Sequence, residues 1–374
     1  MQGNWLLIMA AVTLVTALRN VGLMARHIIL LTVGLLVGQL VSTFQWQTGI
    51  TATGLTQTIY YLILPWLLVH AAQMISRRRL RLLWPWVVVP ATLVFLLTLA
   101  VVSLGLFVLI DHPGFPLISA LIAALLLAAS DPSWSSQLVQ RQRSLLVLLE
   151  GEGIWVEFFA LVGLMVLIKA GSLEELRIAE FALTFTRLLV SSLLLAWLLS
   201  YIVRPLIRWN PGLTLPLAYL SFWGAEWALG LPGAAVCLLL VLLSRPQLAR
   251  GGSQSIEEGA RLGADLLVLI LGFSLTLSMF TERYWVMLAA IGLCLLARLP
   301  VLWATTRGLN HPLTQNSASL WWQLPVHGPV TLALVLSIPV SVTAWWTIQA
   351  ACYGVILFEL LIQRPLAARS VSGS

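Results

Sequence analysis

The segment from Leu148 to Ile168 carries three carboxylates in a stretch that is otherwise apolar enough to cross a bilayer. Glu150, Glu152 and Glu157 all lie in its first half. A charged side chain at bilayer depth costs about 2.5 to 3.5 kcal/mol on insertion scales, and acids in such segments mark ion or proton pathways. Three of them together therefore indicate a site for an ion or a proton.

The composition of the whole chain agrees with a polytopic membrane protein. Hydrophobic residues make up 60% of the 374 residues and charged residues 9%, with a mean hydropathy of +0.96. The formal charge of +7 comes mostly from arginines in short gaps between apolar runs, which is a topogenic pattern and not a nucleic-acid surface. Cys237, Cys294 and Cys352 are isolated from one another, so we expect no disulfide, metal centre or cofactor.

Apolar windows bounded by charges, Gly or Pro predict an all-α fold of about thirteen membrane spans and no soluble domain. Arginines gather in every second gap and at the C-terminus. By the positive-inside rule, the N-terminus lies outside and the C-terminus in the cytoplasm of a bacterial inner (plasma) membrane, which requires an odd number of spans. The predicted spans begin near residues 4, 27, 58, 83, 116, 145, 180, 213, 232, 258, 284, 320 and 344.

The fifth and twelfth spans are each interrupted near their middle. In the fifth, Pro132 removes a backbone donor beside Ser130 and Asp131, and in the twelfth, two prolines flank His327. Each interrupted span is the middle member of a three-span group, about 83–169 and 284–363, and the two groups enter the membrane from opposite sides. Such paired breaks are typical of inverted-repeat secondary transporters, which bind substrate at the midplane between the broken helices.

These motifs resemble the monovalent cation:proton antiporters, in particular the sodium/proton exchanger branch. The similarity runs from ILPWLLVHAA through ALLLAASDPSW and LLEGEGIWVEFFALV to AYLSFWGAEWALGLPGAA and VHGPVTLALVLSIP, and so covers most of the chain. Ser130, Asp131 and Pro132 match the family's T-D-P break. In the family's E-G-E-S motif, which N-D follows two residues later, Gly153 replaces Ser and Val156 replaces Asn.

The resemblance implies the fold and a set of site residues. It implies one transmembrane antiporter domain over residues 1–374 in which two broken helices cross at the midplane, with scaffold spans about 1–82 and 180–281 that form a homodimer. Glu157 stands in the place of the ion-binding Asp, and Glu152 is expected to form a buried ion pair with Arg298. His327 stands where the family has Arg, and His70 where it has an acid.

Glu157 is the carboxylate that we expect to bind the transported ion and the proton. A buried acid can bind a proton or an alkali ion but not readily both, and this competition is the basis of exchange. Asp131 and Ser130 are expected to share the ion shell, because the break frees backbone carbonyls suited to a hard cation. On an ideal helix Glu150 and Gly153 lie on the same face as Glu157.

Each of the other polar residues allows two interpretations of its role. Glu150, His70, His327 and Glu226 could line the pathway or sense pH, or they could be solvated or hydrogen-bonded packing residues. Bundle-interior hydrogen bonds are the default for the remaining intramembrane acids, Asp265 and Glu359. An interfacial belt is expected to include Trp285, Trp321 and Trp322.

The leading hypothesis is a secondary transporter that exchanges Na+ or K+ for protons by alternating access, without being an enzyme. Motifs of metalloproteases, serine hydrolases and phosphate loops do not occur in the sequence. The alternative is a degenerate antiporter-like subunit of a larger membrane complex, with altered or no cation exchange. Gly153 and Val156 favour this alternative, because they remove two neutral oxygens that a dehydrated sodium ion would use.

Overall fold

The computed structural model describes residues 2–46, 48–75, 77–110, 112, 114–140, 142–170, 178–244, 250–307 and 321–372. Over these ranges the chain is helical and contains no β-strand. Twelve of the thirteen predicted spans begin within eight residues of the first residue of a described helix, and the one near residue 320 begins nine residues before α16. Seven of the helices are long and apolar enough to cross a membrane by themselves, and shorter apolar helices lie between them.

The helices fall into four consecutive sets. The first is α1 (Gln2–Ala17), α2 (Leu23–Thr43), α3 (Ala52–Thr58), the π-helical turn η2 (Ile59–Ile63) and α4 (Leu64–Met74). The second is α5 (Arg77–Ile110), α6 (Leu117–Ala128), α7 (Ser133–Ser136) and α8 (Arg143–Ala170). The third is α9 (Ile178–Trp209), α10 (Thr214–Trp223), η4 (Gly224–Ala228), α11 (Gly233–Ser244) and α12 (Arg250–Ser274). The fourth is α13 (Leu277–Glu282), α14 (Tyr284–Arg307), α16 (Pro329–Leu336), α17 (Trp345–Phe358), η5 (Glu359–Gln363) and α18 (Arg364–Ser372).

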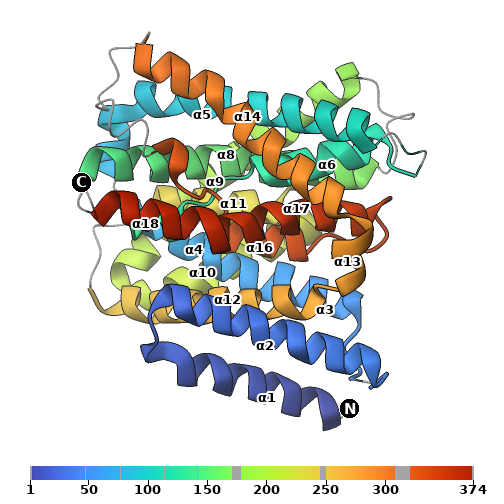
Figure 1. Cartoon of the computed structure of the whole chain (residues 1–374). Coiled ribbons are helices and arrows are strands. Elements are labelled where there is room, and N and C mark those ends of the chain that lie inside the picture. The colour runs from blue at the N-terminus through green and yellow to red at the C-terminus, as the bar shows by residue number, and fades with distance from the viewer. Residues whose placement is uncertain are drawn as a thin grey trace.

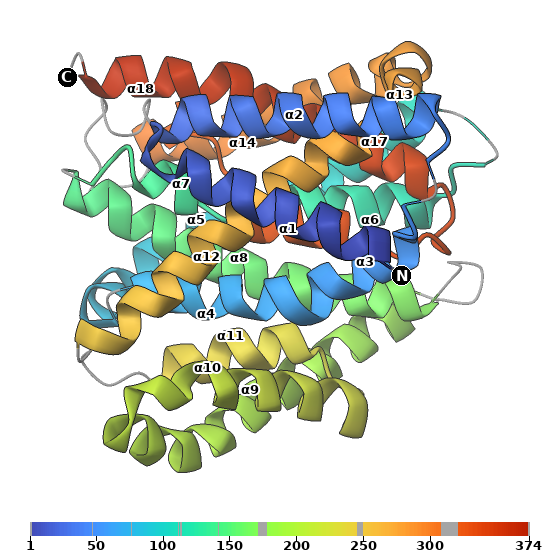
Figure 2. The ribbon, with the colours of Figure 1, turned by 90° about the horizontal axis from the view of Figure 1, so that it is seen from below.

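The long helices run roughly side by side, and the two termini lie at opposite ends of the bundle (Figures 1 and 2). Opposite termini agree with an odd number of crossings. Burial separates central from peripheral helices: the apolar window within Leu117–Ser136 is 83% buried, whereas that within Ala179–Trp209 is 11% buried. Helices α6, α8, α11, α16 and α17 therefore supply most of the interior, and α9 presents its surface outward, where lipid would cover it.

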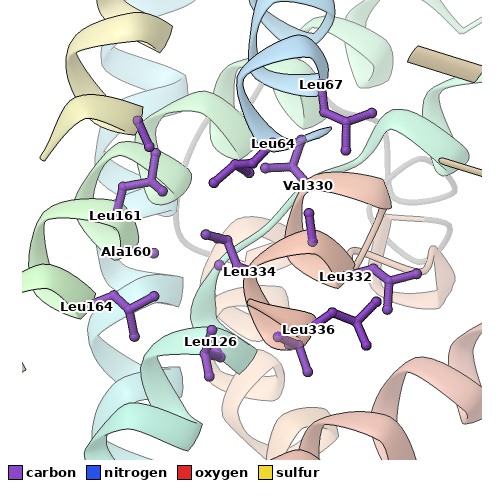
Figure 3. Close-up of a cluster of buried hydrophobic side chains, with 14 of the residues drawn as sticks. Leu64, Leu67, Leu126, Ala160, Leu161, Leu164, Val330, Leu332, Leu334 and Leu336 are labelled. Carbon is purple, nitrogen blue, oxygen red and sulfur yellow. The ribbon is translucent and has the colours of Figure 1, made fainter. Parts of the chain in front are cut away.

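An apolar cluster fills the space between α4, α6, α8 and α16 (Figure 3). On α8 it includes Val156 and Phe158 on either side of Glu157 and continues through Ala160 and Leu161, and on α16 it extends from Val330 to Leu336. These side chains are almost completely buried. The cluster therefore adjoins the predicted site, and its α8 side chains labelled in Figure 3 lie on the side of Glu157 toward the C-terminal end of that helix.

Both predicted interruptions are present. Helix α6 ends at Ala128 and α7 begins at Ser133, and α16 begins at Pro329 after non-helical residues. The two non-helical segments cross, because the backbone N–H of Asp131 donates to the carbonyl of Val326 over 2.7 Å. Gly328 is required at this contact, since a Cβ there would collide with Asp131.

Candidate functional site

Asp131 accepts hydrogen bonds from both interrupted helices. Its Oδ2 accepts the backbone N–H of Val330, in the first turn of α16, over 2.7 Å. Its Oδ1 accepts the backbone N–H of Ser133 over 3.0 Å and also the Ser133 hydroxyl. The first N–H groups of a helix lack partners within the helix, and a carboxylate there satisfies them. Asp131, which is only 3% exposed, therefore caps two helix starts at once.

Glu359 plays a corresponding part for the second interruption. Its Oε2 accepts the backbone N–H groups of Val326 and His327 over 3.1 and 2.9 Å. Its Oε1 lies 2.7 Å from Nδ1 of His327, whose Nε2 lies 2.9 Å from the carbonyl oxygen of Leu127. The expectation of an interior hydrogen bond for Glu359 is confirmed. His327 is buried, and each of its two ring nitrogens has a hydrogen-bond partner.

The carbonyl groups freed by the two breaks also have donors. The hydroxyl of Thr331 donates to Ala129 over 3.0 Å, and the hydroxyl of Ser135 donates to Pro325. The carbonyl of Leu324 accepts from Nη1 of Arg298 and Nε2 of Gln363, over 3.2 and 3.3 Å. Non-helical backbone at membrane depth requires such pairing.

Glu157 stands apart from this network. It is 2% exposed, and its Oε1 has no hydrogen-bond partner among the described residues. The nearby Asp131 carboxylate repels it electrostatically, and the described structure places no cation against it. An unpaired buried carboxylate is costly, so the position is one that a proton or a cation would stabilise.

The side chains of Glu152 and Arg298 both contact Trp321. The indole N–H of Trp321 donates to Oε2 of Glu152 over 2.9 Å, and the guanidinium of Arg298 lies 4.9 Å from the centre of the same ring. No direct ion pair within 4 Å joins the two residues in this structure. The acid and the base still act on each other electrostatically, and the aromatic ring is the physical link between them.

Trp321 therefore differs from the interfacial position expected for it. It is 5% exposed, whereas Trp285 is 69% exposed, as an interfacial residue would be. An aromatic residue near a span end carries the same sequence signal in both positions. Only the path of the chain distinguishes a belt residue from a residue of the ion-pair region.

Gly153 has a packing role. A Cβ at this position would collide with the ring of Pro132 and lie 3.2 Å from the carbonyl oxygen of Ser130. The missing side chain lets α8 pass close to the first break, and this brings Glu157 to the crossing. Val156 is fully buried in the apolar core.

A cavity of about 270 Å³ reaches Asp131 from the end of the bundle where α2 begins. His70 lines it beside Asp131, and the two side chains interact electrostatically. Its wall also includes a buried charged group in which Asp265 lies 3.2 Å from Arg26 and 3.3 Å from His27. The expectation of an interior partner for Asp265 is confirmed.

The remaining predicted residues have separate positions. Ser130 is buried and lines a second, smaller cavity together with Glu152 and His327. Glu150 is half-buried on α8, two residues before Glu152. Glu226 lies away from the crossing: it accepts the backbone N–H of Gly233 over 2.8 Å and lies 3.3 Å from the hydroxyl of Tyr60.

Within the described residues, no group of three or more His, Cys, Asp and Glu side chains is arranged to hold a metal ion. The buried polar centre of the described residues is thus a crossing of two broken helices, where Asp131 and Glu359 accept backbone N–H groups, beside the Glu157 carboxylate, which accepts none. This is the architecture of an ion-coupled secondary transporter.

Comparison with known proteins gives the family. The family model described as "Sodium/hydrogen exchanger, transmembrane" matches residues 6–368, and the chain belongs to this family of cation:proton antiporters. It is therefore a membrane protein related to transporters, not to enzymes. The curated proteins include no match to the sequence.

Solved structures support the same fold. The sodium proton antiporter MjNhaP1 from Methanocaldococcus jannaschii at pH 8 matches with a TM-score of 0.76 and 18% identity, over 97% of this chain and 96% of that chain. An electron-microscopy structure of the same antiporter matches with a TM-score of 0.68 and 19% identity, over 90% and 88% of the two chains. The predicted antiporter fold is thereby confirmed.

Proposed function

We propose that the protein exchanges Na+ or K+ for protons across the plasma membrane, and that both ions compete for Glu157. The observation that carries this proposal is the buried carboxylate of Glu157, whose Oε1 lacks a hydrogen-bond partner and which, unlike Glu152, has neither a donor nor a guanidinium nearby. A proton or a dehydrated alkali cation neutralises such a carboxylate, and only the neutralised site crosses between the two membrane faces at low cost.

The charge balance supports one-for-one, electroneutral exchange. Asp131 has three hydrogen-bond donors, Glu152 has an indole donor and a nearby guanidinium, and Glu359 has an imidazole. Glu157 alone among these buried acids has neither a hydrogen-bond donor nor a positively charged neighbour. One monovalent cation therefore neutralises the site as fully as one proton does, and no net charge moves in a complete cycle.

Asp131 and Ser130 have supporting roles in this proposal. Asp131 fixes the starts of α7 and α16, and its negative charge helps to attract a cation to the crossing. Ser130 and the backbone of the break offer neutral oxygens near the path of α8. Glu152 and Arg298 hold the two repeats together through Trp321.

The proposed route uses alternating access. In this proposal the cavity beside His70 leads to the cytoplasm, the side that arginine-rich gaps mark, and His327 lines the second cavity further along the pathway. Glu150 is assigned to the same pathway from its place on α8 before Glu157. The apolar cluster of Figure 3 closes the other side. Movement of the two core groups, about 83–169 and 284–363, against scaffold spans in a homodimer would open the opposite route.

Reconstituted exchange tests the proposal. In proteoliposomes, a sodium or potassium gradient should drive proton movement by the wild type, and Glu157→Gln should abolish it. The matched control is Glu282→Gln, which removes an exposed acid and should leave exchange unchanged. Full activity of Glu157→Gln would remove Glu157 from the mechanism. No exchange by the folded wild type with any alkali cation would favour the membrane-subunit alternative.

A further inference from the structure

Glu157 and Glu359 occupy the same position in the two three-helix groups. Glu157 follows the first residue of α8 by 14 positions, and Glu359 follows the first residue of α17 by 14 positions in a helix that continues through η5 and α18. Each acid is buried on the third helix of its group, beside the interrupted second helix. The fold therefore contains two acids in equivalent places.

The surroundings of the two acids differ in one respect that bears on ion binding. Glu157 retains an oxygen without a hydrogen-bond partner, whereas both oxygens of Glu359 are engaged. Two backbone N–H groups meet Oε2 of Glu359, and the imidazole of His327 meets Oε1 at 2.7 Å. The side chain of His327 thus fills the place beside Glu359 that is unfilled beside Glu157.

The hydrogen bonds of His327 fix the charge of this pair. The carbonyl of Leu127 can only accept, so Nε2 of His327 carries a proton that it donates over 2.9 Å. The short contact between Nδ1 and Oε1 contains a second proton, on one atom or the other. The pair is imidazolium with carboxylate or imidazole with carboxylic acid, and its net charge is zero in both forms.

We propose that Glu359 is a second cation- and proton-binding carboxylate whose site is permanently occupied by His327. The imidazole stands where the transported ion stands at Glu157, and it keeps the second repeat from taking part in exchange. This inference rests on the proposed function of Glu157. It makes His327 the residue that limits the exchanger to one site per chain.

The neighbourhood of Glu359 has room for an ion once the imidazole is removed. A cavity of about 30 Å³, enough for a water molecule, is lined by Glu359, His327, Ser130 and Gln363. The other titratable or charged groups on its wall are Glu152, Arg298 and Cys294. Deletion of the imidazole would join its own volume to this cavity and leave Oε1 of Glu359 unpartnered, as Oε1 of Glu157 is now.

The test compares the wild type with His327→Ala and His327→Gln. With purified protein in weakly buffered detergent, saturating sodium or potassium should release about one proton per wild-type chain and about two from either variant, a twofold change. Adding Glu359→Gln to either variant should restore single-proton release.

The outcomes separate the inference from the proposed function. A wild type that releases no proton and exchanges nothing overturns the proposed function. A wild type that releases one proton, with folded His327 variants that still release one, overturns only the inference. If the single variants fail to fold, the double variant His327→Gln with Glu359→Gln is tested instead. A double variant that folds supports the imidazole as the counter-charge of Glu359, and a double variant that does not fold overturns the inference.

Discussion

Asp131 and Glu157 approach the same crossing from different helices, and their surroundings have little in common. Asp131 lies in the first break and accepts hydrogen bonds from the starts of two helices. Glu157 lies within the continuous helix α8 and keeps an unpartnered oxygen. Both are buried to nearly the same extent, so burial alone does not distinguish their roles.

The difference shows how one crossing can contain an acid that stabilises the fold and an acid that binds the exchanged ion. A carboxylate that satisfies backbone donors must stay in place, since its loss leaves those donors unpaired. A carboxylate without such bonds is free to exchange its counter-charge. The comparison therefore predicts that substitutions of Asp131 mainly reduce stability and substitutions of Glu157 mainly reduce exchange.

Asp131→Ala should produce the largest loss of stability. It leaves the backbone N–H groups of Ser133 and Val330 without acceptors, at about 1 to 3 kcal/mol for each buried donor. Thermal unfolding in detergent should show a clear decrease in melting temperature, and Asp131→Asn, which keeps one acceptor oxygen, should lie between the alanine variant and the wild type. An unchanged melting temperature of the Asp131→Ala variant would show that Asp131 does not stabilise the two helix starts.

Gly153→Ser, which restores the residue of the family motif, should destabilise this chain. The new side chain would collide with Pro132, and overpacking of this kind costs about 1 to 3 kcal/mol. Gly292→Ser is the matched control, because a Cβ at Gly292 meets nothing within 4 Å. Equal melting temperatures for the two variants would show that α8 can move away from the break, and that Gly153 does not position Glu157.

The pH dependence of exchange should report one competing proton. Below the pH at which Glu157 titrates, protons displace cations, so the apparent KM for sodium or potassium should rise about tenfold for each unit by which the pH falls. Participation of Asp131 as a second proton-binding acid would steepen this to about a hundredfold per unit. Initial rates in proteoliposomes across a pH series measure the slope, and the steeper value would contradict the separation of roles.

Trp321→Phe should have the smallest of these effects, about 1 kcal/mol, because it keeps the ring beneath Arg298 and removes only the N–H donated to Glu152. Trp285→Phe, at an exposed position, should leave the melting temperature unchanged. If the two variants behave alike, the bond from Trp321 does not contribute to the link between Glu152 and Arg298.

Much of this architecture is predictable from the sequence. Apolar length locates the helices, and Pro132 and Pro329 locate the breaks, because proline cannot continue a helix hydrogen-bond pattern. The acids of α8 stand out because charge is rare at bilayer depth. These are local signals, and each is readable without knowing which helices are neighbours.

The partners across the crossing are less predictable. Glu359 lies 32 residues from His327, and nothing in its own segment marks it as more than an isolated acid. In the sequence, Trp321 has the pattern of an interfacial residue, but in the structure it is bonded to Glu152. Gly153 looks in the sequence like the loss of an ion ligand, but in the structure it allows α8 to pack against the first break. Their roles depend on tertiary neighbours, which only the inverted arrangement of the two groups could suggest.

The most direct test of the division between the two acids is cation-induced proton release from purified protein in weakly buffered detergent. On addition of sodium or potassium, the wild type and a folded Asp131→Asn variant should each release about one proton per chain, and Glu157→Gln should release none. Continued release by Glu157→Gln, or its loss in the folded Asp131→Asn variant, would contradict the account by placing the exchanged proton on another group.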